Sequence, residues 1–446
     1  MSERRIERNR SRLREGILFP LKSFLPALGR ARRDGIARIL LVLWIISSPT
    51  LVSAAIDEND IHDVDPNNVD FYKFFVADQV TYDDNLYRLP ANSSSIDTVL
   101  SRNARRQDTT ETVSLGLDGQ WIYGRQLVTV DLRADQNYFL HNTDLNNFAT
   151  DDKIDWSWRV GSYLSGQLGA DFNRSLANFA ETLFLGRDLV DSADYFGSAR
   201  YQLGPHWAAF GGVKDTTSSH SAEAAQYNDI REKSGNAGLE YATTVDDTFG
   251  LEYRYTDARF PEGYVLDSLP FDRDYHEYIT QFLIKYALTE KTLLQANFGY
   301  LKHDYLHASF GTFSGDTWRV SLQWQPTDKT QLLVAGWREL KAYLYSQSNY
   351  FLSKGVSVTP SWTASEKIRM TLAVSWEDDD YSTINAAALG LGARRDGVGA
   401  AQARLQYTPT SALTLNLSYR YQKRDSNESA FEFGDRLAEV DATFKF

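Results

Sequence analysis

The chain of 446 residues contains no cysteine. An exported protein of this composition has no disulfide to stabilise it, so its stability must come from an extensive hydrogen-bonded structure. Beyond residue 54 no apolar run approaches the roughly 20 residues that a membrane-spanning helix needs, and the mean hydropathy of the chain is negative. These absences exclude a disulfide-stapled domain and a bundle of membrane helices for that part of the chain.

The first 54 residues are the exception in both charge and hydropathy. Arginines recur from Arg4 to Arg38 and precede an apolar stretch at residues 39–46, and small residues near Ala54 supply a cleavage site. We interpret residues 1–54 as a secretory signal peptide. The alternative is a signal anchor or an inner-membrane helix, for which the apolar stretch is short.

Basic charge is scarce once this leader is set aside. Residues 1–54 carry 11 Lys or Arg and 4 Asp or Glu, a net of +7, so the formal charge of −12 for the whole chain leaves −19 for the remainder. A nucleic-acid-binding protein needs a basic footprint that such a chain lacks. We therefore expect no nucleic-acid partner.

What the chain does contain is alternation with period two. At the C-terminus, apolar residues from Ala438 to Phe446 alternate with Glu439, Asp441, Thr443 and Lys445. This spacing predicts a strand with one apolar face that continues to the last residue. An apolar face that continues to the last residue is favourable when the strand contacts lipid. The same alternation occurs near residues 128–134, 154–160, 249–255, 318–324, 370–376, 401–407 and 413–421.

Aromatic residues make up 13% of the chain, and many lie near the predicted strand ends. In outer-membrane barrels, aromatic girdles mark both membrane interfaces, and half of each strand faces a polar lumen. The aromatic excess and the negative hydropathy therefore both indicate such a barrel.

The connections between the strands alternate between tight turns and long polar loops. The tight turns are predicted at residues 123–125, 165–166, 203–205, 244–247, 289–291, 326–329, 364–367 and 409–411. The long loops are predicted at residues 142–151, 177–190, 215–229, 259–272, 304–315, 341–354, 377–395 and 425–434. Short turns on one side and long loops on the other are typical of an outer-membrane barrel, with the short turns in the periplasm.

The predicted fold is an all-β, transmembrane, antiparallel up-and-down barrel of about 18 strands, with 16 as the alternative. Its first strand covers residues 71–82 and should pair with the last, residues 436–446. Residues 55–70 form a short periplasmic segment, residues 71–446 the single barrel, and residues 91–108 an extracellular or lumen-inserted loop. A weak repeat near 40 residues also fits a propeller, but two long strands per repeat favour the barrel.

If the Phe446 side faces lipid, the alternate positions face the lumen. The lumen-lining candidates are Arg133, Arg159, Arg200, Arg254, Arg319, Arg404, Arg420, Asp131, Asp135, Asp155, Asp171, Glu240, Glu252, Glu439 and Asp441. Such side chains can hydrogen-bond sugar hydroxyls or attract an anionic chain. The alternative is that they are mutually neutralising lumen salt bridges.

Catalysis and metal binding find little support in the sequence. His303 and His307 lie four residues apart beside Asp304, but in a predicted loop with no helix to place both on one face. Acidic pairs such as Asp151 and Asp152 are common on loops without calcium. We expect no catalytic residues, no metal and no cofactor, and the protein is not expected to be an enzyme.

One segment early in the predicted mature chain resembles a known family. It reads Val80-Thr81-Tyr82-Asp83-Asp84-Asn85-Leu86-Tyr87-Arg88-Leu89-Pro90. Together with residues 106–109 and 119–121, it is similar to the EpsL-type beta-barrel porins encoded in exopolysaccharide operons. The resemblance covers essentially the whole mature chain. It implies an outer-membrane barrel associated with biosynthesis and export of extracellular polysaccharide, and it transfers no catalytic residues.

The leading hypothesis is therefore an outer-membrane channel for a secreted polysaccharide. A general or small-solute porin is the alternative, and a plugged scaffold barrel that recruits periplasmic or inner-membrane secretion proteins is a third. The expected partners are outer-membrane lipid, a polysaccharide chain and the outer-membrane assembly machinery. Resemblance to other barrels implies that Phe446 and Phe444 act as the assembly signal.

Overall fold

The computed structural model describes residues 70–91, 104–180, 184–244, 247–262, 264–266, 269–271, 273–306, 312–345, 348–381 and 393–446. The predicted signal peptide and all but the last residue of the predicted periplasmic segment lie outside these residues, as does most of the predicted loop at 91–108. No helix within the described ranges has the length and apolar character needed to cross a membrane.

The described residues form one antiparallel sheet of 18 strands. The first half consists of β1 (Phe71–Asp83), β2 (Asp108–Tyr123), β3 (Gln126–Phe139), β4 (Asn147–Val160), β5 (Leu164–Leu176), β6 (Leu189–Gln202), β7 (Trp207–His220), β8 (Ile230–Ala242) and β9 (Thr248–Arg259). The second half consists of β12 (Tyr275–Thr289), β13 (Thr292–Tyr305), β14 (Phe313–Thr327), β15 (Thr330–Tyr345), β16 (Ser348–Ser365), β17 (Ile368–Tyr381), β18 (Arg395–Thr410), β19 (Leu413–Ser426) and β20 (Phe433–Lys445).

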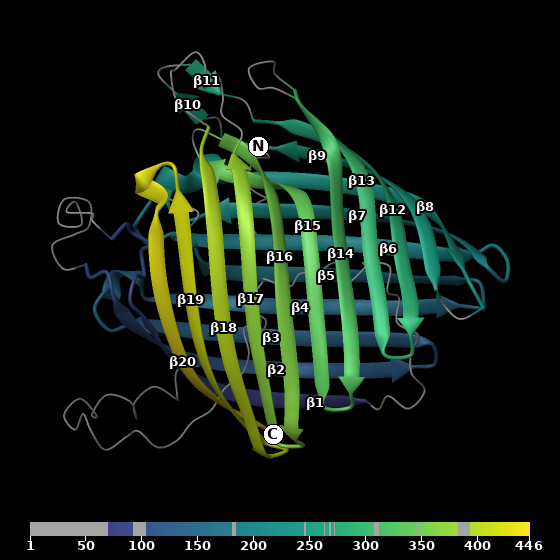
Figure 1. Ribbon diagram of the computed structural model, residues 1–446, viewed down its shortest axis with the longest axis horizontal. Coiled ribbons are helices and arrows are strands. Elements are labelled where there is room, and N and C mark those ends of the chain that lie inside the picture. Colours follow the sequence, from purple (N-terminus) through teal and green to yellow (C-terminus); the bar gives the residue numbers. More distant parts are fainter. Residues whose placement is uncertain are drawn as a thin grey trace, which may run out of the picture. The chain divides into compact units, whose positions relative to one another are not determined.

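Short elements occupy four of the longer connections. The 3-10 turns η3 (Thr143–Leu145), η4 (Glu223–Asn228) and η5 (Ser429–Phe431) follow β3, β7 and β19. The hairpin of β10 (Tyr264–Leu266) and β11 (Leu269–Phe271) follows β9. Figure 1 shows this hairpin beyond the end of the barrel that is opposite the C-terminus.

The sheet closes on itself because β1 pairs with both β2 and β20. Gln79 lies opposite Asp441 in the closing pair, and the backbone N–H of Phe74 donates to the carbonyl of Phe446 at 3.0 Å while the reverse bond measures 2.9 Å. The predicted pairing of the first and last strands is confirmed, as is the count of 18. A closed sheet leaves no unpaired edge, which is the condition for strands to cross a membrane.

The outer face of the sheet is apolar over most of each strand's length. On β17, the outward residues Met370, Leu372, Val374 and Trp376 are 42–48% exposed, and their register partners on β18 are Leu405, Ala403, Ala401 and Gly399. A water-soluble protein seldom exposes so continuous an apolar surface. The band therefore faces lipid, and the aromatic residues beside the short turns, among them Tyr72, Trp121, Tyr123, Tyr163, Trp207, Trp324 and Trp362, form a girdle at the periplasmic interface.

One tight turn lies elsewhere than the sequence predicts. Residues 165–166 belong to β5, and the turn from β4 to β5 lies at residues 161–163. Gly161 permits this turn because its φ of +64° lies in the left-handed region. Gly166 has a different role: the ring of Trp158 on β4 packs against it so closely that a Cβ there would come within 2.3 Å of that ring.

The predicted long loop at residues 341–354 is also wrong, because β15 and β16 continue through it and leave only residues 346–347 between them. Charged residues replace apolar ones on the outer face at this height, so the apolar alternation stops while the strands do not. Lys354 contacts Asp380 at 2.8 Å, and Arg395 contacts the same carboxylate at 3.3 Å. The strands thus extend beyond the lipid-facing band on the side of the long loops.

Candidate functional site: the interior of the barrel

The inner face of the sheet carries the charged positions that the alternation singled out. All of the lumen-lining candidates lie on the face opposite the apolar band. On β3 these are Asp131, Arg133 and Asp135; on β4 and β5, Asp155, Arg159 and Asp171; on β6, β8 and β9, Arg200, Glu240, Glu252 and Arg254; on β14, Arg319; and on β18 to β20, Arg404, Arg420, Glu439 and Asp441.

Several of these candidates contact one another. Ion pairs join Arg133 to Asp135 at 2.8 Å, Arg200 to Glu240 at 2.6 Å and Arg254 to Glu252 at 3.1 Å. The structure does not join all of the candidates into one cluster: Asp131 lies opposite Asp118 on β2, and Asp171 lies opposite Asp194 on β6. The interior is therefore a mosaic of paired charges with two places where carboxylates face each other.

The inner wall also contains polar residues that the sequence pattern did not single out. Glu339 on β15 binds Arg319 through two contacts, and the amide of Gln281 on β12 donates to Glu252 at 3.1 Å. Asn297 on β13 donates to Gln281 at 3.3 Å. Apolar residues occupy both faces of β12 and β15 near these positions, which hides the alternation, and uncharged amides give no signal of lumen orientation.

A polar hollow lies along the inner wall from β8 to β15. Its volume is about 450 Å³, and its lining includes Glu240, Glu252, Arg254, Gln281, Asn297, Arg319 and Glu339. The hollow shows that the wall on this side is not filled by its own side chains.

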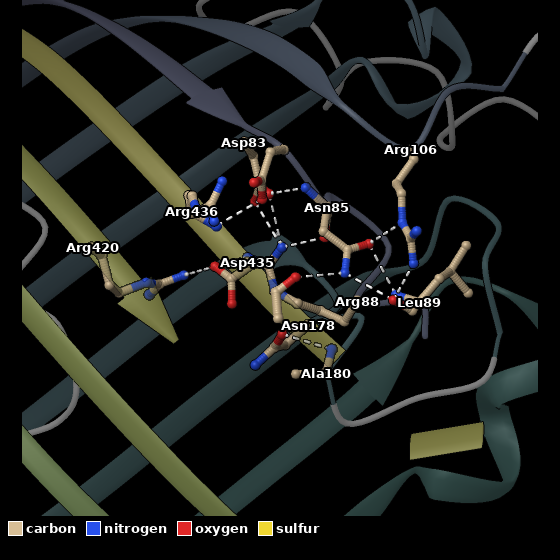
Figure 2. Close-up of polar contacts among 12 residues, drawn as sticks. Asp83, Asn85, Arg88, Leu89, Arg106, Asn178, Ala180, Arg420, Asp435 and Arg436 are labelled. Atoms are coloured by element: carbon tan, nitrogen blue, oxygen red, sulfur yellow. Dashed lines mark hydrogen bonds and ion pairs between the residues drawn. The ribbon is translucent and has the colours of Figure 1, made fainter. Parts of the chain in front are cut away.

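At the extracellular end, residues 84–91, which follow β1, fold inward against the inner wall near β20 (Figure 2). This side of the barrel is opposite the hollow on β8–β15. Arg88 contacts the carboxylate of Asp83 at 2.8 Å and that of Asp435 on β20 at 3.5 Å. Asp435 also contacts Arg420 at 3.5 Å and is 1% exposed. Both acids lie on the inner face, so the Arg88 guanidinium lies inside the mouth. Arg88 has a φ of +54°, a conformation that costs about 1–2 kcal/mol and that these ion pairs offset.

Asn85 and Arg106 fix the shape of this segment. The side-chain amide of Asn85 donates to the carbonyl of Leu89 and to that of Gly434 on β20, both at 2.9 Å. Arg106 donates to the side-chain oxygen of Asn85 at 3.0 Å and also to the carbonyls of Leu89 and Pro90. The two described ends of the β1–β2 connection are therefore tied together and to the barrel wall.

The segment after β5 reaches the same side of the mouth. Arg424, on the inner face of β19, donates to the carbonyl of Ala180 at 2.6 Å. The strands β20, β1, β2, β3 and β4 separate β19 from β5 in the closed sheet, so residues 177–180 cross the interior of the mouth to make this contact.

An apolar cluster holds the crossing segments together. Tyr87, Phe139, Leu145 and Phe179 are buried in it, and the rings of Tyr87 and Phe179 lie 4.9 Å apart. Burial, together with the nearby carboxylates of Asp108 and Asp144, raises the pKa of the Tyr87 phenol to about 12. The phenol therefore stays neutral at any physiological pH, and the cluster does not depend on its titration.

No group of histidine and acidic side chains suited to a metal ion occurs among the described residues. His303 stacks on Tyr275, with 4.1 Å between ring centroids, and lies 3.2 Å from Glu277. His307, the other member of the predicted pair, lies outside the described residues. The interior thus offers charged and amide groups for binding rather than a metal centre.

Residues 264–446 match the model of a protein family described as "Putative beta-barrel porin 2". No curated protein matches the chain. Among solved structures, the chain is similar to the outer membrane protein opdK from Pseudomonas aeruginosa, with 13% identity, a TM-score of 0.44 and coverage of 84% of this chain and 99% of that one.

Two further solved structures are similar at the same level. A BenF-like porin from Pseudomonas fluorescens Pf-5 shows 11% identity and a TM-score of 0.47, with 84% of this chain and 98% of that one covered. OccK2 (OpdF) from Pseudomonas aeruginosa shows 12% identity and a TM-score of 0.46, with the same coverage of 84% and 98%.

The family match supplies what the geometry alone does not. The protein is a closed sheet of 18 strands with an apolar outer band, and its part from residue 264 onward matches a porin family. It is therefore a porin-like barrel of the bacterial outer membrane. The apolar outer band is accordingly surrounded by outer-membrane lipid.

Proposed function

We propose that this barrel is a channel through which small hydrophilic solutes cross the outer membrane. The observation that carries the proposal is the combination of a polar hollow along β8–β15 with a mouth that is narrowed from the other side. The segments at residues 84–91 and 177–180 lie across that mouth, held by Arg88, Asp435 and Arg424. We expect a small solute to pass through the part of the mouth that these two segments leave open.

Export of a polysaccharide, which the EpsL-type resemblance of residues 80–90 implies, is the second candidate. A polymer would have to pass the narrowed mouth as an extended chain. The small-solute channel is preferred because the hollow on β8–β15, with a volume of about 450 Å³, has the size of a small solute. A plugged scaffold is the third candidate, for which the hollow would have no use.

The purified protein is expected to produce discrete current steps in planar lipid bilayers and to let glucose into proteoliposomes, while a dextran of several kilodaltons stays outside. The physical reason is that residues 84–91 and 177–180 narrow the mouth, which restricts a folded polymer more than a small solute. The measurement is single-channel recording combined with liposome swelling.

The same pair of measurements separates the alternatives. Absence of current steps and of swelling would contradict the channel and favour the plugged scaffold. Loss of surface polysaccharide on deletion of the gene, with no swelling in glucose, would favour polysaccharide export instead. Unchanged surface polysaccharide together with glucose entry is the result that the proposal predicts.

A further inference from the structure

We propose that the inner wall of β8–β15 carries a binding site for a neutral, polyhydroxylated solute of about mono- to disaccharide size. This inference rests on the proposed channel function and adds a substrate class to it. The site is the hollow of about 450 Å³ described above. Since a water molecule occupies about 30 Å³ in the liquid, the hollow holds on the order of fifteen waters, which is the scale of one or two sugar rings.

The shape of the hollow follows from residues that carry no side chain into it. Gly250 on β9 lines it and lies opposite Leu283 on β12. Gly299 on β13 lies between Gln281 and Thr317 in the register, and a Cβ there would come 3.0 Å from the Cβ of Gln281. These two positions let the long polar side chains of the neighbouring strands lie along the wall.

Most of the charged side chains that line the hollow are in ion pairs. Glu252 contacts Arg254 at 3.1 Å, and Arg319 binds Glu339 through two nearly parallel contacts of 2.7 and 2.5 Å. Glu240 is bound by Arg200 at 2.6 Å. A charged solute would have to break one of these pairs and leave a charge without its partner. A neutral solute avoids that loss.

Amide groups connect the pairs into a run of alternating donors and acceptors. Asn297 donates to Gln281, which in turn donates to Glu252 at 3.1 Å. Asn236 donates to the other oxygen of the same carboxylate at 3.4 Å. Gln281, Asn297 and Asn236 each still have an unused lone pair or N–H, whereas Glu252 is 1% exposed and serves to orient these amides. A hydroxyl both donates and accepts, so adjacent hydroxyls on one ring can bind a carboxylate and an amide or guanidinium together.

The opposite wall is more acidic along its central row. On β2 to β6 the lumen row runs Asp118, Asp131, Lys153, Asp171 and Asp194, with carboxylates facing each other at two points. Such a row presents charge rather than alternating neutral donors and acceptors. The geometry therefore points to the β8–β15 wall and not to the lumen in general.

The test is saccharide-induced interruption of the single-channel current of the full-length protein in planar bilayers, with maltotriose as the probe. Gln281→Leu removes the amide between Glu252 and Asn297 while keeping the side-chain size. We expect the dissociation constant for maltotriose, of which one or two rings fit the hollow, to rise about tenfold, since one or two hydrogen bonds are worth about 1.4 kcal/mol together.

The matched control is Gln167→Leu on the opposite wall, where the amide donates to Asp155 at 2.9 Å. It should leave the maltotriose dissociation constant unchanged. Equal effects of the two substitutions, or none, would overturn the inference while leaving the channel function intact. Absence of current steps in the native protein would instead overturn the channel function.

A comparison that needs no variant guards against misfolding of Gln281→Leu. Glucose, gluconate and glucosamine share a carbon skeleton and differ in charge, and each can compete with maltotriose in the same recording. Glucose should compete at the lowest concentration. If gluconate or glucosamine competes better, the site selects charge and the inference is wrong.

Discussion

Replacing Val374 by arginine should lower the free energy of unfolding in a lipid bilayer by about 2–4 kcal/mol, the cost of a guanidinium at the middle of the lipid face. Val374 is outward on β17 and 46% exposed, and its register partners Val358 and Ala401 are apolar. The measurement is a urea titration of the protein folded into lipid vesicles, followed by the loss of the compact band on an unheated gel.

The neighbouring residue supplies the control for this substitution. Ser375 lies on the inner face, opposite Ser357 and Ala400, where water and Glu377 on the same strand can accommodate a guanidinium. Ser375→Arg should change the free energy of unfolding by less than about 1 kcal/mol. If both substitutions cost the same, β17 does not have one lipid face and one lumen face.

Phe446→Asp should lower the amount of folded barrel in the outer membrane about tenfold or more. Phe446 is 65% exposed on the outer face and stacks on Phe74, with 6.2 Å between ring centroids. Removing the ring forfeits about 1.5–3 kcal/mol of apolar burial in lipid. If the residue is also part of the assembly signal, the loss in cells will exceed the loss on refolding the purified protein into vesicles.

The two readouts for this substitution are heat-modifiable protein in the outer-membrane fraction and refolding yield in vesicles. Lys445→Gln is the control, because Lys445 lies on the inner face and contacts Asp118 at 2.6 Å. It should leave the level in the outer membrane nearly unchanged. A normal level of Phe446→Asp would contradict both the lipid-facing placement and the assembly role.

Much of this architecture can be predicted from alternation alone, because in a barrel wall each side chain meets either lipid or the lumen. The first strand, predicted at residues 71–82, is Phe71–Asp83. The period of two also assigns the arginines to the face opposite the apolar band, since a guanidinium in lipid is so costly that the two faces differ sharply in composition. The strand count then follows from the turns.

The alternation predicts less where both faces have a similar character. On β15 and β16 the outward positions become charged above the lipid band. The sequence pattern there resembles that of a loop, although the strands continue. Two outward carboxylates also break the pattern: Asp78 lies opposite Val113 and Ala442, and Asp152 accepts a hydrogen bond from the backbone N–H of Arg133 at 3.2 Å. Neither exception could be foreseen from the period of the sequence.

The mouth was the least predictable part of the candidate site. Residues 91–108 are predicted to form an extracellular or lumen-inserted loop, and most of them lie outside the described residues. The contacts that the structure describes at the mouth come from residues 84–91, 104–107 and 177–180. Arg424 and Ala180 are 244 residues apart in the chain, and no periodic pattern relates them. Contacts of this kind depend on how the barrel closes, which brings together loops that are distant in sequence.

All of these contacts depend on closure of the sheet between β1 and β20. The absence of native cysteine allows a direct test of that closure. Ala77 on β1 lies opposite Thr443 on β20. Because Phe74 and Phe446 exchange both backbone hydrogen bonds, the pair three positions along is a non-hydrogen-bonded pair, with Cα atoms about 4.5 Å apart. This separation lies within the range of about 4.4–6.8 Å that a disulfide spans.

The measurement is disulfide formation in Ala77→Cys/Thr443→Cys, detected in the outer-membrane fraction by the faster migration of the denatured, unreduced chain. The control, Ala77→Cys/Glu439→Cys, displaces one cysteine by four residues along the strand, roughly 13 Å. A closed barrel with this register should form a cross-link in Ala77→Cys/Thr443→Cys and none in the control. No cross-link in the first, or equal cross-linking in both, would contradict a closed barrel with this register.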